Sequence, residues 1–80
     1  MSIPNEVHER FFEGRRTDEV RFVINDAVNV TSGPHAGRFG PVISILSLDP
    51  EVTFLVESFT PPYGDVQVRQ SDLERDETAC

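Results

Sequence analysis

The chain has 80 residues, of which 38% are hydrophobic and 26% charged, enough for one small domain with a modest core and too few for a second. Fourteen acidic residues against seven basic ones give a formal charge of -7, so nucleic-acid phosphates repel the chain on average. It has no apolar run long enough to span a membrane, and Glu6 and Glu9 stand where a secretory signal would need positive charge. We expect a cytoplasmic protein that makes no use of membranes.

The first segment, residues 1–19, is expected to contain a short helix and a polar connection. Residues 2–14 carry a polar cap, apolar side chains at helical separations and a glycine stop, namely Asn5, Val7, Phe11, Phe12 and Gly14. A helix of about ten residues is marginal alone in water. We therefore expect both phenylalanines to be buried, either over an open end of the domain or against a partner.

Short β-strands are predicted from residue 20 onward. Val20 to Ile24 alternates with polar residues and predicts either an added strand or the lead into the next one, and the pair that follows, Asn25 and Asp26, favours a bend. Val28 and Val30 belong to one strand, and residues 41–48 form another because they are rich in valine and isoleucine. A loop with three glycines separates the two.

The second half of the chain continues the strand pattern. Asp49 and Pro50 signal a turn, after which residues 52–56 alternate and predict a hairpin with residues 41–48. Residues 58–64 are a proline-rich loop, and residues 65–69 are another strand. Residues 70–73 are expected to form a single turn with a buried leucine. The acidic tail, 74–80, is predicted to be disordered.

The run from Asp26 to Val42 resembles the KOW motif of ribosomal large-subunit proteins and NusG-type transcription elongation factors. The residues that fall at the spacing of the family are Asp26, Val28, Val30, Gly33, Gly37, Gly40 and Val42, while Ala36 stands where the family usually has a basic residue. The resemblance implies a small, strongly bent barrel of the SH3 type, whose loop contacts RNA or a protein.

The expected fold is therefore mostly β: a small five-stranded SH3-like (KOW-type) barrel over residues 20–73, with a short N-terminal helix. Barrel closure suits several short strands because it leaves no sheet edge exposed.

The glycine loop is the first candidate binding site. Its residues are Gly33, Pro34, His35, Gly37, Arg38, Phe39 and Gly40. An exposed aromatic ring beside a guanidinium can stack on a base or contact a protein surface. Phe39 is alternatively a core residue, and we expect His35 to face solvent rather than to act as a ligand or general base.

The second candidate is the loop that contains Phe59, Pro61, Pro62 and Tyr63. Aromatic residues and prolines give contact area at low entropic cost. The alternative is a structural loop with Phe59 packed inward. If both loops lie at one end of the barrel, they would share a surface with Arg38 and Arg69, and Arg15, Arg16 and Arg69 would form a basic rim.

We find no pattern for catalysis, a metal or a cofactor. The two histidines lie far apart, the one cysteine is the last residue, and no nucleophile elbow, phosphate loop or paired metal-ligand motif occurs. The sequence therefore favours a non-catalytic module that binds a protein partner, in transcription or translation assemblies as the resemblance implies. The alternatives are direct RNA binding, self-association through Phe11, Phe12 or an uncovered strand, and an acidic inhibitor of the immunity type.

Overall fold

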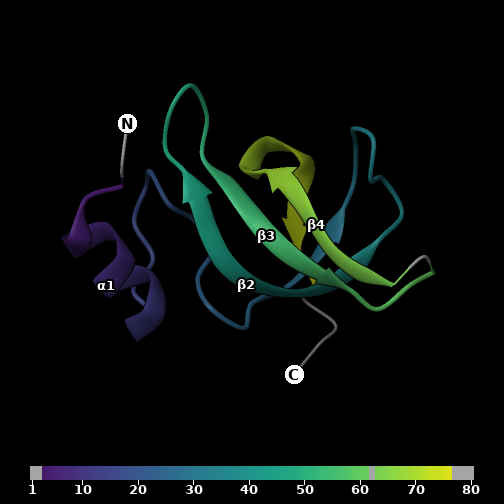
Figure 1. Ribbon diagram of the computed structural model, residues 1–80, viewed down its shortest axis with the longest axis horizontal. Coiled ribbons are helices and arrows are strands. Elements are labelled where there is room, and N and C mark those ends of the chain that lie inside the picture. The colour runs from purple at the N-terminus through teal and green to yellow at the C-terminus, as the bar shows by residue number, and fades with distance from the viewer. Residues whose placement is uncertain (1–2, 62, 77–80) are drawn as a thin grey trace.

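The protein folds into one short helix and five antiparallel strands that form a single sheet (Figure 1). The computed structural model describes residues 3–61 and 63–76. The elements in chain order are α1 (Asn5–Glu13), β1 (Ala27–Val30), β2 (Phe39–Ser47), β3 (Thr53–Ser58), β4 (Gly64–Arg69), the short 3-10 helix η1 (Gln70–Asp72) and β5 (Leu73–Arg75). The sheet order is β4-β3-β2-β1-β5. The mostly β class is confirmed, and the sheet is open with β4 and β5 as its outer strands.

The helix α1 ends as predicted but buries only one phenylalanine. Gly14 adopts a left-handed conformation at φ 79°, and its N–H donates to the carbonyl of Phe11. Pro4 is the N-cap, so the prediction that Asn5 caps the helix is wrong. Phe11 is 1% exposed and stacks on Phe54, whereas Phe12 is 55% exposed. Adjacent helical residues point about 100° apart, so the sheet can cover only one of the two rings.

Of the two alternatives predicted for residues 20–24, the added strand does not form, and the segment leads into the turn before β1. Val20, Phe22 and Val23 are all buried, which departs from the alternation of a strand with one buried face. The segment is held instead by the buried side chain of Gln70. Its amide nitrogen donates to the carbonyl of Glu19 at 3.0 Å, and its amide oxygen accepts from the N–H of Arg21 at 2.8 Å.

The bend predicted after this segment is confirmed. Asn25 has a φ of 67°, and the N–H of Asp26 donates to the carbonyl of Val23 at 3.1 Å. The carboxylate of Asp26 accepts from the N–H of Val23 at 2.9 Å, which closes the turn a second time. The turn is attached to β2, because the N–H of Asn25 donates to the carbonyl of Val42 at 2.8 Å.

The core lies between the sheet, α1 and the irregular segment. Phe54 contributes the largest buried side chain of β3, and Val28, Val42 and Val56 belong to the same core cluster with no exposed area. The alternation predicted for residues 52–56 is confirmed, because Val52, Phe54 and Val56 are buried. Leu73 is also buried immediately after η1, as predicted for the closing turn.

The chain stays ordered beyond the predicted start of the tail. Glu74 pairs with Asn29 and Arg75 pairs with Val28, so β5 adds a fifth strand beside β1. The expectation of disorder from residue 74 is therefore wrong for these two residues. Polar side chains misled the prediction because both are exposed on a short outer strand, where only the backbone is paired. Residues 77–80 lie outside the described part.

Gly40 lies on β2 with the backbone of β3 directly against it. A Cβ atom on this residue would lie 1.8 Å from the carbonyl oxygen of Glu57, so no other residue fits without moving a strand. We expect Gly40→Ala to lower the free energy of unfolding by about 1–3 kcal/mol, as overpacking does. Urea unfolding followed by circular dichroism measures this change. Gly64→Ala is the control, since its φ of 131° strains an added side chain as well, while its Cβ meets nothing within 4 Å. An equal loss in both variants would contradict the role of the close approach.

The contacts of Gln70 predict a second stability effect. Gln70→Ala removes both hydrogen-bond partners of the segment at residues 19–21, and the loss of these two part-buried hydrogen bonds costs about 1–3 kcal/mol in total. The same urea titration tests it, with Gln67→Ala as the matched control because Gln67 is exposed. A Gln70→Ala protein as stable as the control would show that water replaces these hydrogen bonds without cost.

Candidate binding surface

The glycine loop forms a closed turn over residues 31–38, and the last two predicted loop residues, Phe39 and Gly40, belong to β2. The N–H of Val30 donates to the carbonyl of Arg38 at 2.8 Å, and the N–H of Gly37 donates back to the carbonyl of Val30 at 2.8 Å. Gly33 and Gly37 have φ values of 82° and 95°, which side chains with a Cβ rarely adopt. The loop therefore presents its side chains from a constrained frame.

The two candidate loops meet through a pair of aromatic rings. The N–H of Phe59 donates to the carbonyl of Phe39 at 2.9 Å, and the ring centroids lie 6.4 Å apart in an edge-to-face arrangement. Phe39 is 43% exposed and Phe59 is 54% exposed. The alternative assignments, in which Phe39 belongs to the core or Phe59 packs inward, are therefore wrong. We call these two residues the aromatic pair.

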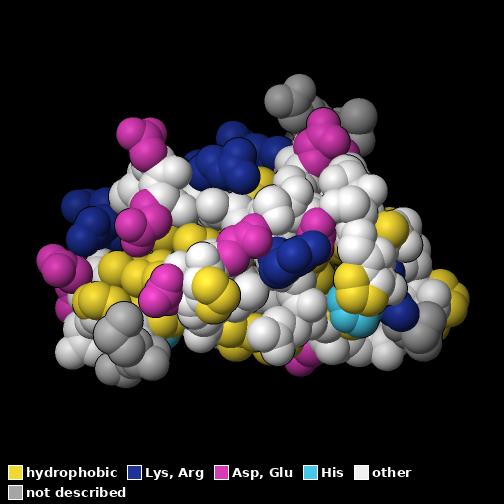
Figure 2. Space-filling view, turned by 90° about the horizontal axis from the view of Figure 1, so that it is seen from above, with side chains coloured by type: hydrophobic (Ala, Val, Ile, Leu, Met, Phe, Trp, Pro, Cys, Tyr) yellow, Lys and Arg dark blue, Asp and Glu magenta, His cyan; other side chains and the backbone are white. Residues whose placement is uncertain are grey.

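Other residues of the predicted site are near neighbours of the aromatic pair in sequence. The Nη1 atom of Arg38 donates to the Oγ atom of Ser58 at 3.5 Å, which links the glycine loop to the end of β3. Tyr63 is 74% exposed and Pro61 is exposed. Pro62 lies outside the described residues. Figure 2 shows hydrophobic, arginine and histidine side chains side by side at the right-hand end, the end that holds the glycine loop in Figure 1.

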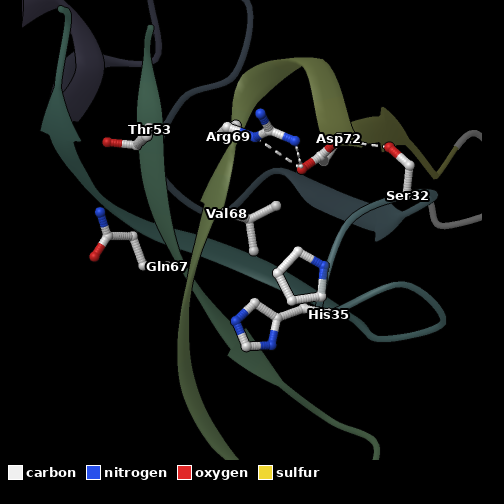
Figure 3. Close-up of a pocket in the computed structure, with 8 residues that line it drawn as sticks. Ser32, His35, Thr53, Gln67, Val68, Arg69 and Asp72 are labelled. Atoms are coloured by element: carbon white, nitrogen blue, oxygen red, sulfur yellow. Dashed lines mark hydrogen bonds and ion pairs between the residues drawn. The ribbon is translucent and has the colours of Figure 1, made fainter. Parts of the chain in front are cut away.

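A pocket of about 430 Å³ lies where the glycine loop faces β4 and η1 (Figure 3). Its lining residues are Ser32, Pro34, His35, Thr53, Gln67, Val68, Arg69 and Asp72. The carboxylate of Asp72 connects its two sides. One carboxylate oxygen accepts from the Oγ atom of Ser32 at 2.6 Å, and the other accepts from Nε and Nη2 of Arg69 at 3.2 and 3.1 Å. Asp72 thus fixes the glycine loop to η1.

Electrostatics and close contact reinforce this connection. The hydrogen bond from Ser32 and the nearby guanidinium of Arg69 lower the pKa of Asp72 below its usual 3.8, against the opposing effect of burial. The main chain is joined as well, since the N–H of Thr31 donates to the carbonyl of Asp72 at 2.8 Å. A Cβ on Gly33 would lie 2.6 Å from the Asp72 carboxylate. Because Gly33 has no side chain, the Asp72 carboxylate can approach the backbone of the loop.

His35 is partly buried at the pocket rather than directed to solvent as predicted. Its Nδ1 atom is buried and has no hydrogen-bond partner among the described residues, which is uncommon for a buried polar atom. Figure 3 shows its ring beside β4, close to Val68. His35 therefore lines the pocket, while its Nδ1 atom is closed off from solvent.

The predicted basic rim is not one surface. Arg15 lies 3.7 Å from the carboxylate of Glu13, and Arg16 forms an ion pair with Asp26. Both arginines follow α1, at the end of the molecule away from the glycine loop (Figure 1). Arg69 alone of the three lies at the pocket, where it is paired with Asp72. The described part of the chain holds no cluster of three potential metal ligands and no helix that could cross a membrane.

Sequence reasoning missed Ser32 and Asp72, the two residues that join the loop to η1. Nothing in their local pattern sets them apart, because they lie 40 positions apart in the chain. A glycine beside a serine in the loop was the only available signal. This signal could not identify Asp72, because the sequence does not show which distant carboxylate approaches the loop.

The pKa of Asp72 gives a testable consequence. Ser32→Ala removes the strongest cause of the lowered pKa, so we expect the Asp72 pKa to rise toward 3.8. Ionised Asp72 stabilises the fold fully above pH 3.8, and this stabilisation is lost as the pH falls through its lower folded-state pKa. The wild type should therefore lose more stability than Ser32→Ala on acidification below pH 3.8. Carboxyl chemical shifts in an NMR titration measure the pKa.

Ser71→Ala is the matched control for this titration. Ser71 neighbours Asp72 in sequence, but its hydroxyl donates to Glu51. The Asp72 pKa should therefore stay low in this variant. An unchanged pKa in Ser32→Ala would show that the serine does not hold the carboxylate.

No protein-family model, curated protein or solved structure matches this chain. The likeness to the KOW motif therefore depends on the seven matching residues that lie between Asp26 and Val42, both included.

Proposed function

We propose that the chain is a non-catalytic binding module, an SH3-like barrel of the KOW type, that recognises a protein partner through the aromatic pair. The resemblance in the glycine loop implies a place in transcription or translation assemblies. One observation carries the proposal: Phe39 and Phe59, from segments 20 residues apart, are held edge to face while both remain about half exposed.

The order of the strands supports the barrel proposal. In the sheet order β4-β3-β2-β1-β5, the last strand returns to pair with the first. β2 pairs with β1 over its first residues and with β3 over the rest, with register shifts between Val42 and Ser44 and between Ile45 and Ser47. Such irregularities bend strands. The short 3-10 turn before β5 fits the same architecture.

The aromatic pair has the properties of a binding hot spot. Exposed aromatic side chains in small soluble domains commonly mark interaction sites, and large rings contribute most of the energy of many interfaces. The hydrogen bond between the backbones of Phe59 and Phe39 fixes both Cα positions before a partner arrives. A surface ordered in advance loses less entropy on binding.

The distribution of charge favours a protein over RNA as the partner. The chain carries a charge of -7, and four of its arginines are paired with carboxylates: Arg10 with Glu6, Arg15 with Glu13, Arg16 with Asp26 and Arg69 with Asp72. RNA binding depends on cations that replace the counterions of phosphates. Local pairing reduces the attraction of these cations for phosphate.

Affinity capture with the full chain tests the proposal. We expect the wild-type protein to retain a specific protein from native lysate, with and without nuclease. The double variant Phe39→Ser/Phe59→Ser should lower the captured amount at least about tenfold, equivalent to about 1.4 kcal/mol. Phe12→Ser is the control, because Phe12 on α1 is as exposed as Phe59 but belongs to the other end of the molecule.

The outcomes distinguish the alternatives. Loss of the captured material after nuclease, together with a steep dependence on salt and a loss in Arg38→Ala, would favour direct RNA binding. Equal capture by the double variant and the wild type would exclude the aromatic pair as the site. Urea unfolding of each variant separates a lost contact from a lost fold.

A further inference from the structure

Two carboxylates lie beside the aromatic pair on the same face of the sheet. Glu57 is directly opposite Asp65 in the register of β3 and β4, and both side chains are exposed. Alternate residues along a strand share a face and lie about 7 Å apart, so Phe59 follows Glu57 on this face. The ring of Phe59 in turn contacts Phe39. We call Glu57 and Asp65 the acidic pair.

The acidic pair is not neutralised within the described part of the chain. Four other carboxylates there form ion pairs with arginines, whereas the side chains of Glu57 and Asp65 form neither an ion pair nor a hydrogen bond. Arg69, which lies four residues beyond Asp65, is bound to Asp72. Like charges directly opposite each other destabilise a strand pair. The acidic pair therefore costs stability unless a cation lies between its carboxylates.

Protection of a sheet edge explains only one of the two charges. A charged residue on an outer strand keeps other strands from pairing with it, and this accounts for Asp65 on β4. It does not account for Glu57, because β3 lies between β2 and β4 in the sheet. The position of Glu57 opposite Asp65 and beside the aromatic pair instead suits the binding of a positive charge from another molecule.

The two pairs together match the chemistry of a guanidinium group. In an edge-to-face arrangement, the ring that presents its edge keeps both of its own faces free of the other ring, and a cation is attracted to such a face within about 6 Å. A guanidinium is planar, stacks on aromatic rings and carries five N–H donors that carboxylates accept. The ammonium of a lysine is a strongly hydrated point charge that cannot stack.

We propose that the aromatic pair and the acidic pair together bind an arginine side chain of the protein partner. The guanidinium stacks on a phenylalanine ring and donates to Glu57 and Asp65. This inference rests on the proposed function, because it names the chemistry that the aromatic pair recognises. The charge of -7 attracts a basic segment of a partner toward this face. The same carboxylates repel the phosphates of RNA.

Titration of the full chain with two end-blocked tripeptides, followed by NMR, tests the proposal. One peptide is Gly-Arg-Gly, and the other has citrulline, which is similar in shape but uncharged, in place of arginine. We expect saturable chemical-shift changes at the aromatic pair and the acidic pair with the arginine peptide and none with the citrulline peptide. Added salt should weaken the binding, because it screens exposed charges.

The variant Glu57→Gln/Asp65→Asn removes both charges and keeps the side-chain shapes. It should bind the arginine peptide at least about tenfold more weakly than the wild type. The matched control is Glu9→Gln/Asp18→Asn, which changes the same two residue types at exposed positions on α1 and just after it. Its affinity should equal that of the wild type. The first variant also removes a repulsion, so it should unfold at no lower urea concentration than the wild type, which separates lost binding from a lost fold.

Four results would overturn the proposal. These are no shifts with the arginine peptide, equal shifts with the citrulline peptide, equal affinity in the two charge variants, and shifts at the aromatic pair caused by a short single-stranded RNA instead of the arginine peptide. Affinity capture distinguishes this failure from a failure of the proposed function. If the arginine peptide fails but Phe39→Ser/Phe59→Ser still loses the captured protein, only the assignment of arginine is wrong. If that variant captures as well as the wild type, both are wrong.

Discussion

The close approach of β2 and β3 at Gly40 is the constraint on which the candidate surface depends. No side chain fits between Gly40 and the carbonyl of Glu57, so the two backbones can converge there. Their convergence lets Phe59 donate its N–H to the carbonyl of Phe39. Because both backbones are fixed, the rings meet each other and remain exposed. A residue with no side chain thus determines where the two rings of the aromatic pair lie.

Elsewhere in the chain, buried polar side chains fix the positions of neighbouring segments. Asp72 joins the glycine loop to η1, and Gln70, two residues earlier, holds the irregular segment before β1. Both side chains are buried, and both have hydrogen-bond partners about 40 to 50 positions away. One short turn therefore orders two segments that have little regular structure of their own.

Local patterns predicted most of the strands but not these connections. Alternation predicted Phe54 and Val56 in the core, and glycine spacing predicted the loop after β1, because both signals depend only on neighbours in sequence. The added strand considered for residues 20–24 does not form, and the disorder expected from Glu74 is wrong for Glu74 and Arg75. In each case the structure is determined by a group distant in sequence. Gln70 holds the segment before β1, and β1 pairs with the residues of β5. The sequence left the exposure of Phe39 and Phe59 open, because a hydrophobic ring suits a binding surface as well as the core.

The pairing of β5 with β1 has a consequence for how the protein folds during synthesis. β1 lies in the first half of the chain, yet its second neighbour is Leu73–Arg75. Hairpins such as β2–β3 can form from nearby residues, but contacts between distant segments form slowly. A nascent chain that has emerged only as far as β4 leaves one side of β1 uncovered. The last turn and three residues therefore complete the sheet, and until they leave the ribosome the growing polypeptide carries an open edge that chaperones can bind.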